Sequence, residues 1–369
     1  MKNKTVKQGV LLCLAVLVLI AILVLIGVTG SKETTNSYKV GLILTGRADD
    51  SGWNREHYDG VVSACKELGV ELIVKENIAE GSGACNTAIR ELVEKGVGMI
   101  MLSSYSYAME CKDTIDSYPQ IAFYSISSAY SAKNVTSYFG RMYQARYLAG
   151  ILAGLQTENN VIGYVAAMEN SEVNRGINAF TLGVKSVNPK AKVFVYWTGS
   201  WEDSEKESDA AKKLIYDKSA DVLTYHQNQP YTAQTADKEG VYSIGYHAVA
   251  EGLSEKYLTA VVWNWDALYY QIIKEYVQGK ANTVERRWFS IDSGVVGLSE
   301  YSSLVSEEKR YMVNEAMSKI LSGKDVFSGE IYDAEGILRC GEKETLSDDV
   351  LFENMDWLVE GVVIYNEEN

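Results

Sequence analysis

The stretch LILTGRADDSGWNREHYDG, from Leu42 to Gly60, decides the fold that the sequence predicts. It begins inside an apolar run that we interpret as a buried strand, and it continues through an acidic loop into a helix. Apolar residues recur on this helix at 3.6-residue spacing as far as Leu68, and Gly69 stands where a helix C-terminus is capped. Ligands of open α/β sheets bind beyond the carboxyl ends of the strands. The loop 45–54 is therefore the first candidate for a binding site.

The side chains of this loop suit a flat, neutral, hydroxylated ligand. Asp49 and Asp50 offer acceptors, Asn54 has an amide that donates and accepts, and Trp53 has a large π-face. Two aspartates could also serve a glycosidase as acid and base. Adjacent loop residues usually point apart, however, so we favour one ligand-binding aspartate and one that begins the helix.

The alternation of strand and helix continues along the chain. A first cycle runs to about residue 140, and a second cycle starts near Tyr143. Such alternation predicts βαβ units and parallel sheets. Because 369 residues exceed what one core usually organises, two cycles predict two lobes. The expected fold is thus α/β, with a parallel sheet flanked by helices in each lobe and a ligand in the cleft between them.

The same pattern gives the expected lobe boundaries. The chain should return to the first lobe near His247 and cross again near Ser290. Several crossings predict a hinge that lets the lobes close on a ligand. Each lobe then takes two segments of the chain: 38–140 with 248–289 for the first, and 141–247 with 290–369 for the second.

The N-terminus carries an anchoring or export segment. Three lysines precede Val10 to Val28, a run without a charge or a hydroxyl group. Its length is near the roughly 20 residues that span a bilayer and exceeds the roughly 7 to 15 of a signal h-region. The basic residues before it place the body of the protein outside the cytoplasm. Either residues 1–30 remain as a membrane anchor with 31–37 as a tether, or a signal is removed before Ser31.

Composition and motifs disfavour several classes of function. A net charge of −14 argues against nucleic acid, whose binding depends on lysine and arginine at the phosphates. No glycine-rich phosphate motif follows a predicted strand, and the aspartates of the first loop would repel a phosphate. The histidines lack metal-ligand spacing, and no nucleophile elbow occurs. We therefore expect no catalysis, no metal and no cofactor. Cys65 and Cys85 lie on apolar helix faces, which predicts buried thiols.

Aromatic residues gather at the ends of the predicted strands. A planar ligand can stack on such rings while neighbouring polar groups orient it. Most tryptophans pack in the hydrophobic core, so we expect only two or three of the aromatic residues in the cleft. The candidates besides Trp53 are Tyr105, Tyr143, Trp201, Trp263 and Trp265, and the histidines at strand ends are His226 and His247.

Taken together, these segments resemble the BMP (basic membrane protein) family, which are substrate-binding proteins of ABC transporters and include purine-nucleoside-binding lipoproteins. The resemblance covers about 38–363, and its segments are specific by their order and spacing. It implies a two-lobed type I periplasmic-binding-protein fold, no catalysis, and a nucleoside or nucleobase held between the lobes. The segments include DDSGWNREHYDG, TSYFGRMYQARYLAGILAG, GYVAAMENSEVNRGINAFTLGVKSVNP, ADVLTYHQNQ and LSDDVLFENMDWLVEGVV.

The resemblance also implies roles for single residues. By motif, Asp50 takes ribose hydroxyls or base nitrogens, Trp53 stacks on the base, and Asn54 is the neighbouring amide. This leaves Asp49 to begin the helix. The remaining matches are Tyr105 after the third strand, the polar loop of His226, Gln227 and Asn228, and the aromatic loop of Trp263 and Trp265.

Two departures from the family bear on the ligand. His247 stands where many relatives have an acidic residue, and the loop after His226 has amides where relatives often have an aspartate. If that acid binds ribose in relatives, this chain favours a free base or a modified nucleoside. Cys13 lacks the setting of a lipid-attachment cysteine.

We therefore expect a monomeric extracytoplasmic receptor that delivers a purine nucleoside or nucleobase to ABC permease subunits. The alternatives are an exported nucleoside hydrolase or glycosidase, and a receptor for a sugar-type signal, because sugars also stack on tryptophan.

Overall fold

The computed structural model describes residues 38–50, 52–127, 130, 132–280 and 286–365. The predicted anchor, 1–30, and the predicted tether, 31–37, lie outside the described residues. Within the described ranges, no helix combines the length and the apolar character needed to cross a membrane.

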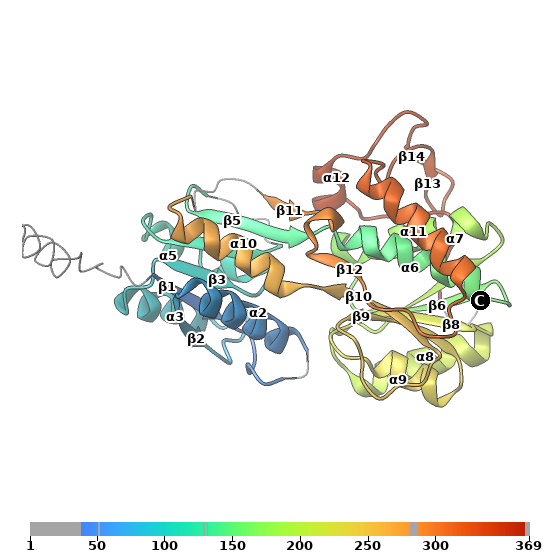
Figure 1. The fold of residues 1–369 in the computed structure, drawn as a ribbon, viewed down its shortest axis with the longest axis horizontal. Coiled ribbons are helices and arrows are strands. Elements are labelled where there is room, and N and C mark those ends of the chain that lie inside the picture. Colours follow the sequence, from blue (N-terminus) through green and yellow to red (C-terminus); the bar gives the residue numbers. More distant parts are fainter. Residues whose placement is uncertain (1–37, 51, 128–129, 131, 281–285, 366–369) are drawn as a thin grey trace, which may run out of the picture. The chain divides into compact units, whose positions relative to one another are not determined.

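The first lobe is built on a parallel sheet of six strands (Figure 1). α2 (Trp53–Leu68) packs with α10 (Trp265–Val277) on one face. α3 (Ala84–Glu94), α4 (Tyr107–Glu110) and α5 (Lys112–Asp116) cover the other face. Because both faces are covered, the central strands are continuous apolar runs such as MIML. In spatial order the strands are β11 (Arg287–Phe289), β5 (Val135–Gly140), β4 (Ala122–Ile126), β3 (Met99–Leu102), β1 (Lys39–Ile43) and β2 (Glu71–Lys75).

The second lobe is built on a sheet of seven strands. Its helices are α6 (Met142–Gln156), α7 (Ser171–Val187), α8 (Ser204–Lys218), α9 (Tyr231–Lys238), α11 (Glu307–Leu321) and α12 (Asp348–Glu353). Figure 1 shows α8 and α9 on the face opposite to α6 and α7. In spatial order the strands are β12 (Val296–Leu298), β10 (Tyr257–Trp263), β9 (Tyr242–His247), β8 (Val222–His226), β6 (Val161–Ala166), β7 (Lys192–Trp197) and β15 (Val362–Ile364). A short hairpin of β13 (Ile331–Tyr332) and β14 (Leu338–Cys340) follows α11.

One strand of the second sheet departs from the predicted parallel arrangement. β12 pairs antiparallel with β10, whereas the other neighbours in this sheet are parallel. The chain reaches β12 directly from β11 in the first lobe, with only the short helix η1 (Ile291–Ser293) between the two strands. It therefore enters the second sheet at the end where β10 leaves it, and so runs in the opposite direction.

The chain crosses between the lobes three times. It passes from β5 to α6 at Arg141, from β10 to α10 at Asn264, and from β11 to β12. Hydrogen bonds join these crossings, since the backbone N–H of Arg141 donates to Phe289 (2.6 Å) and that of Asn264 to Val295 (2.7 Å). The crossings therefore lie side by side.

The second crossing corrects the predicted lobe boundary. The sequence assigned 248–289 to the first lobe, with a return near His247, but β10 within that segment pairs with β9 and β12 of the second sheet. The return comes at Asn264 instead. An apolar run such as 258–262 shows that a strand is buried but not which sheet buries it. The third crossing is the step from β11 to β12.

Two glycines let α6 and α7 approach each other closely. A Cβ atom added at Gly150 would lie 1.9 Å from the carbonyl oxygen of Phe180, and one added at Gly183 would lie 2.1 Å from that of Tyr147. Only glycine leaves room for these backbone contacts. The LAGILAG segment is therefore a packing surface for the neighbouring helix.

The described cysteines are Cys65, Cys85, Cys111 and Cys340, and all four are buried free thiols. Burial raises the pKa of Cys65 to about 12. The prediction of buried thiols at Cys65 and Cys85 is confirmed.

Candidate functional site

A cavity of about 180 Å³ lies at the carboxyl ends of strands from both sheets. We call it the cleft cavity. In the first lobe its lining residues lie at or beyond the ends of β1 to β5 or begin α2. In the second lobe they follow β7 and β8, end β9 or lie in the first turn of α7. Its apolar wall is Trp53, Tyr105, Ile126, Phe139, Trp201 and Tyr246; its polar wall is Thr45, Glu80, Ser103, Ser104, Ser127, Glu172, Asn228 and His247.

The first-lobe wall is held by side chains that bind one another. The Trp53 Nε1–H donates to the carbonyl oxygen of Ser103 (2.8 Å), which fixes the indole at the start of α2. The Glu80 carboxylate accepts from the hydroxyls of Ser104 and Ser106. Tyr105, between these serines, is 59% exposed. A ring that is both exposed and beside a cavity can cover a ligand face.

The second-lobe wall contains Trp201, Asn228 and Glu172. The backbone N–H of Asn228 donates to the carbonyl oxygen of Trp201 (2.9 Å), so a hydrogen bond joins the loops after β7 and β8. The buried amide of Gln227 satisfies its partners when it donates to Ser200 (2.8 Å) and Trp201 (3.1 Å) and accepts from Thr198. Gln227 therefore shapes this wall from behind.

Glu172, in the first turn of α7, is a carboxylate of the second lobe that lines the cleft cavity. Burial raises its pKa, an effect opposed by Arg175, by Arg146 and by a hydrogen bond from Ser127 of the first lobe. Its Oε1 lies 3.8 Å from Nε2 of His226. It therefore has polar partners in both lobes.

The loop 45–54 reverses the roles predicted for its aspartates. Asp50 accepts from the backbone N–H groups of Gly52 (3.0 Å) and Arg55 (2.9 Å) and from the Asn54 amide (2.8 Å), so it is Asp50 that begins α2. Asp49 instead pairs with Arg47 on the surface. Asn54 also accepts from Thr45 (3.0 Å) and Gly46 (3.1 Å). Asp50 and Asn54 thus hold the loop that places Trp53.

The cleft cavity brings together five of the twelve predicted site residues: Trp53, Tyr105, Trp201, Asn228 and His247. Asp50, Asn54 and Gln227 support it through the networks above. His226 is buried beside Glu172, behind the second-lobe wall.

The other predicted aromatics are part of the core. Trp263 and Trp265 stack on each other with centroids 4.4 Å apart, and they pack behind Phe139 and Trp53 respectively. Tyr143 is buried between Trp288 and Phe327. Trp263 and Trp265 thus support the cavity wall from the core side.

His57, on α2, does not lie on the surface. It is fully buried, with Nδ1 2.5 Å from the Tyr269 hydroxyl, because the face of α2 that carries it packs on α10.

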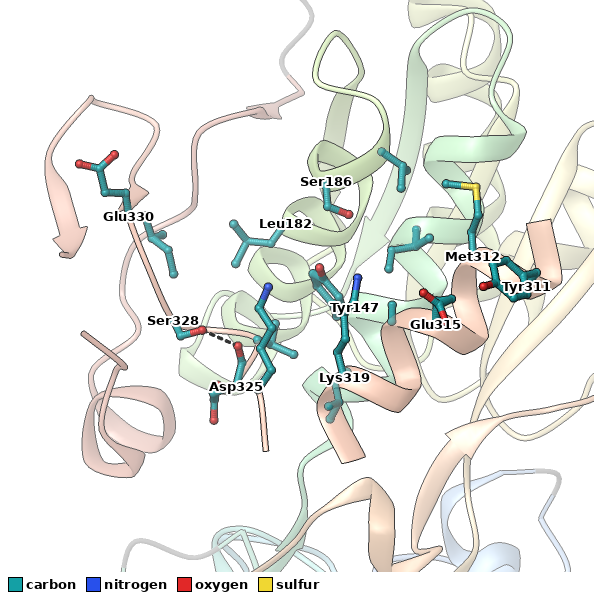
Figure 2. A pocket seen from close by; sticks show the side chains of 17 residues that line it. Tyr147, Leu182, Ser186, Tyr311, Met312, Glu315, Lys319, Asp325, Ser328 and Glu330 are labelled. Carbon is teal, nitrogen blue, oxygen red and sulfur yellow. Dashed lines mark hydrogen bonds between the residues drawn. The ribbon is translucent and has the colours of Figure 1, made fainter. Parts of the chain in front are cut away.

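A larger hollow, about 520 Å³, lies between α6, α7, α11 and the segment that follows α11 (Figure 2). Tyr147, Leu182 and Glu315 are among the side chains around it. Its described lining residues include no strand of the two large sheets and none of the twelve predicted residues. The cleft cavity is therefore the candidate site.

Residues 37–328 match the family described as "ABC transporter substrate-binding protein PnrA-like", named Bmp. The chain belongs to the Bmp family. This confirms the family resemblance of the sequence and makes the chain a member of a family of extracytoplasmic substrate-binding proteins of ABC transporters.

Relatives of this Bmp protein match over most of its length. A purine-binding protein of Brucella abortus is 30% identical over 90% of this chain and 95% of its own. A Haloferax volcanii protein, TsgA13, whose name gives it as an ABC transporter glucose-binding protein, is 30% identical over 90% of this chain and 84% of its own.

Solved structures agree with the predicted two-lobed α/β fold. A transcriptional activator of the comK gene from Bacillus halodurans has a TM-score of 0.69 at 26% identity, covering 77% of this chain and 98% of its own. An ABC transporter solute-binding protein from Aeropyrum pernix K1 has a TM-score of 0.67 at 18% identity, covering 88% and 100%. The fold prediction is thus confirmed.

Sequence reasoning missed several residues of the Bmp cleft cavity. Tyr246 stands directly before His247, so the strand-end rule that selected His247 also leads to Tyr246. Ser103 and Ser104 lie just after β3, and Glu172 lies in the first turn of α7, but small hydroxyls after strands and acids at helix starts are too common to single out. Within the described part of the chain, no group of three or more His, Cys, Asp or Glu side chains is placed to hold a metal ion.

His247 has an unusual backbone and an unusual environment for a histidine. Its φ of 82° lies in the left-handed region, a conformation that clusters at functional sites in residues other than glycine. Burial, and secondarily the charge of Arg146, lowers its pKa to about 4, although Asp50 opposes this effect. The ring packs 5.2 Å from Trp53 and 5.5 Å from Tyr246. His247 is therefore neutral in the folded protein at pH 7.

This pKa predicts how stability depends on pH. Between the unfolded value of about 6.5 and the folded value of about 4, protons bind this histidine only in the unfolded chain, so stability falls as the pH falls. From pH 7 to pH 5 the wild type should lose about 2 kcal/mol of unfolding free energy relative to His247→Asn, a variant that tolerates the positive φ. Denaturant unfolding at both pH values measures this. An equal pH dependence in both proteins contradicts it.

Proposed function

We propose that this protein is the substrate-binding protein of an ABC importer, that it holds a purine nucleobase or nucleoside in the cleft cavity, and that it delivers this ligand to permease subunits. The observation that carries the proposal is the composition of the cavity. Trp53, Tyr105 and Trp201 offer π-faces, and hydroxyl, amide, carboxyl and imidazole groups surround them. A planar, polar-edged ligand matches this combination.

The size of the cavity supports a small ligand. Its volume of about 180 Å³ is below the roughly 300–1,000 Å³ of sites that take drug-sized ligands. This favours a free base over a nucleoside, in line with the histidine at position 247. The name of the Brucella abortus relative, a purine-binding protein, points to the same class of ligand.

The location of the protein is part of the proposal. The apolar run Val10 to Val28 either anchors the body to the outer side of the cell membrane or directs its export before removal. We propose that the receptor acts as a monomer, with one ligand per chain.

A ligand screen tests the proposal. The body from Ser31 onward is heated with purine bases, nucleosides and sugars, and its unfolding is followed by tryptophan fluorescence. A ligand present at 100 times its dissociation constant adds about 2.7 kcal/mol to the folded state. We expect stabilisation by a purine base or nucleoside, with the glycosidic bond of the nucleoside intact after incubation. Release of the base from a nucleoside would point to hydrolase activity instead. If no purine base or nucleoside raises the unfolding temperature, the proposal is overturned.

A sugar is the second candidate ligand. Trp201 is 37% exposed beside the cavity, and tryptophan faces also bind sugar rings; the Haloferax relative is named for glucose. The sugar samples of the same screen decide between the two classes.

A further inference from the structure

Arg146 is a buried cation whose guanidinium has no hydrogen-bond partner among the described residues. It lies in the second turn of α6, is 0% exposed, and is the largest fully buried side chain of the protein's described part. Its guanidinium carbon stands 4.0 Å from the ring centre of Tyr246 and 5.4 Å from that of Tyr164. Among the described residues, none offers a hydrogen-bond acceptor to Nε, Nη1 or Nη2. The rings therefore position the guanidinium while its donors stay unused.

The second arginine of this wall behaves differently. Arg175 is also buried, but it donates to the carbonyl oxygen of Leu351 and lies over Trp288 at 4.8 Å. Its role is thus to join α7 to the C-terminal segment. A buried charge without hydrogen bonds is costly, and native proteins keep such groups for a reason. Packing explains Arg175 but does not explain Arg146.

Arg146 lines a small cavity next to the cleft cavity. Its volume of about 10 Å³ is close to that of one oxygen-sized probe. It shares Phe139, Glu172 and Tyr246 with the cleft cavity. The two spaces therefore meet at these side chains.

The charges around this point favour an acceptor on the ligand. Arg146 and Arg175 both act on the Glu172 carboxylate, which is the acid of this group and already accepts from Ser127. Two guanidinium groups face one carboxylate, so one positive charge is left over. His226, whose ring nitrogens likewise find no hydrogen-bond partner in the described ranges, is neutral at pH 7 because burial and Arg146 lower its pKa.

We propose that Arg146 is a specificity-determining residue that donates to a carbonyl or anionic oxygen of the ligand. The inference rests on the proposed function, because it concerns the ligand proposed for the cleft cavity, which meets the small cavity at Arg146. For a purine, it selects a base with an oxygen at carbon 6, such as hypoxanthine or xanthine, over adenine. The exocyclic oxygen accepts from the guanidinium, whereas the amino group of adenine would bring a donor to a donor. Glu172 beside it can accept from the ring N–H that accompanies that oxygen.

The experiment measures dissociation constants by calorimetry for hypoxanthine, adenine and urate, an anion at neutral pH. The proteins are the wild type, Arg146→Lys and Arg146→Met, each as the body from Ser31. The wild type should bind hypoxanthine at least tenfold more tightly than adenine. Arg146→Met should lose that preference, with adenine changed less than threefold, and Arg146→Lys should keep part of it. If urate binds more weakly than hypoxanthine, the group that Arg146 binds is a neutral carbonyl oxygen. If urate binds more tightly, that group is an anionic oxygen.

Thermal unfolding without ligand separates this role from a structural one. Methionine replaces an unpaired buried charge by an apolar side chain of similar length, so the ligand-free variant should unfold at the same or a higher temperature than the wild type. A lower unfolding temperature together with equal losses for both bases would show that Arg146 acts in folding, and would overturn the inference. So would a wild type that does not distinguish hypoxanthine from adenine, although purine binding itself would stand. If no purine binds the wild type, the proposed function fails first, and this inference fails with it.

Discussion

Replacing Gly183 by alanine should lower the free energy of unfolding by about 3 kcal/mol. The new Cβ atom would lie 2.1 Å from the carbonyl oxygen of Tyr147 and 3.0 Å from the backbone nitrogen of Ile151. Both are backbone atoms of α6, so no side-chain rotation relieves the clash and the helices must separate. Denaturant unfolding followed by circular dichroism measures the change.

Gly176→Ala is the matched control, because it lies in the same helix. Its added Cβ would meet the Nδ1 atom of His226 at 3.3 Å, a side-chain atom that can shift. The gain in helix propensity of up to about 1 kcal/mol offsets this contact, so stability should change little. If both variants lose stability equally, the close approach of α6 and α7 is not the cause.

Replacing Trp53 by alanine should weaken ligand binding by about 10- to 100-fold. Stacking of a base on an aromatic ring contributes about 1–3 kcal/mol, and the indole lines the cavity with its N–H already bonded to Ser103. Its polar edge is thus occupied, and its contribution to the ligand is the ring face. Titration of the ligand found in the screen, followed by calorimetry, measures the loss.

Trp53→Phe is the control for this prediction. Phenylalanine keeps a π-face at the same position but not the hydrogen bond to Ser103, so affinity should fall only a few-fold. Unchanged affinity in Trp53→Ala would remove stacking at this residue from the binding mechanism. A loss of the same size in both variants would instead assign the effect to the lost hydrogen bond.

Much of the fold could be predicted because each strand and helix follows from a pattern of neighbouring residues. The run before Thr45, the αL cap at Gly69 and the amphipathic α11 each follow from neighbouring residues. The membership of β10 in the second sheet could not be predicted, because pairing partners are distant in sequence. The direction of β12 depends in the same way on where the third crossing enters the sheet.

The candidate site shows the same division between local and distant information. The strand-end rule led to Trp53, Trp201 and His247, which all line the cleft cavity. Asp50 and Asn54 share the loop, but their hydrogen bonds are directed into it, and composition does not reveal direction. Arg146 lies inside an apolar helix pattern, in which a single arginine is expected on the exposed face. The contact with Tyr246 that buries it comes from a distant strand and cannot be read from this pattern.

The three crossings have a consequence for the entropy of binding. A lobe on one flexible connection could tumble freely relative to the other, and capturing a ligand would freeze all of those rotations. Here backbone hydrogen bonds from Arg141 to Phe289 and from Asn264 to Val295 join the crossings. The easiest motion of one lobe relative to the other is then a hinge rotation about the line of the crossings. Less rotational freedom is lost on closure. A ligand as small as a single base, with few atoms to contribute, can then still hold the two lobes together.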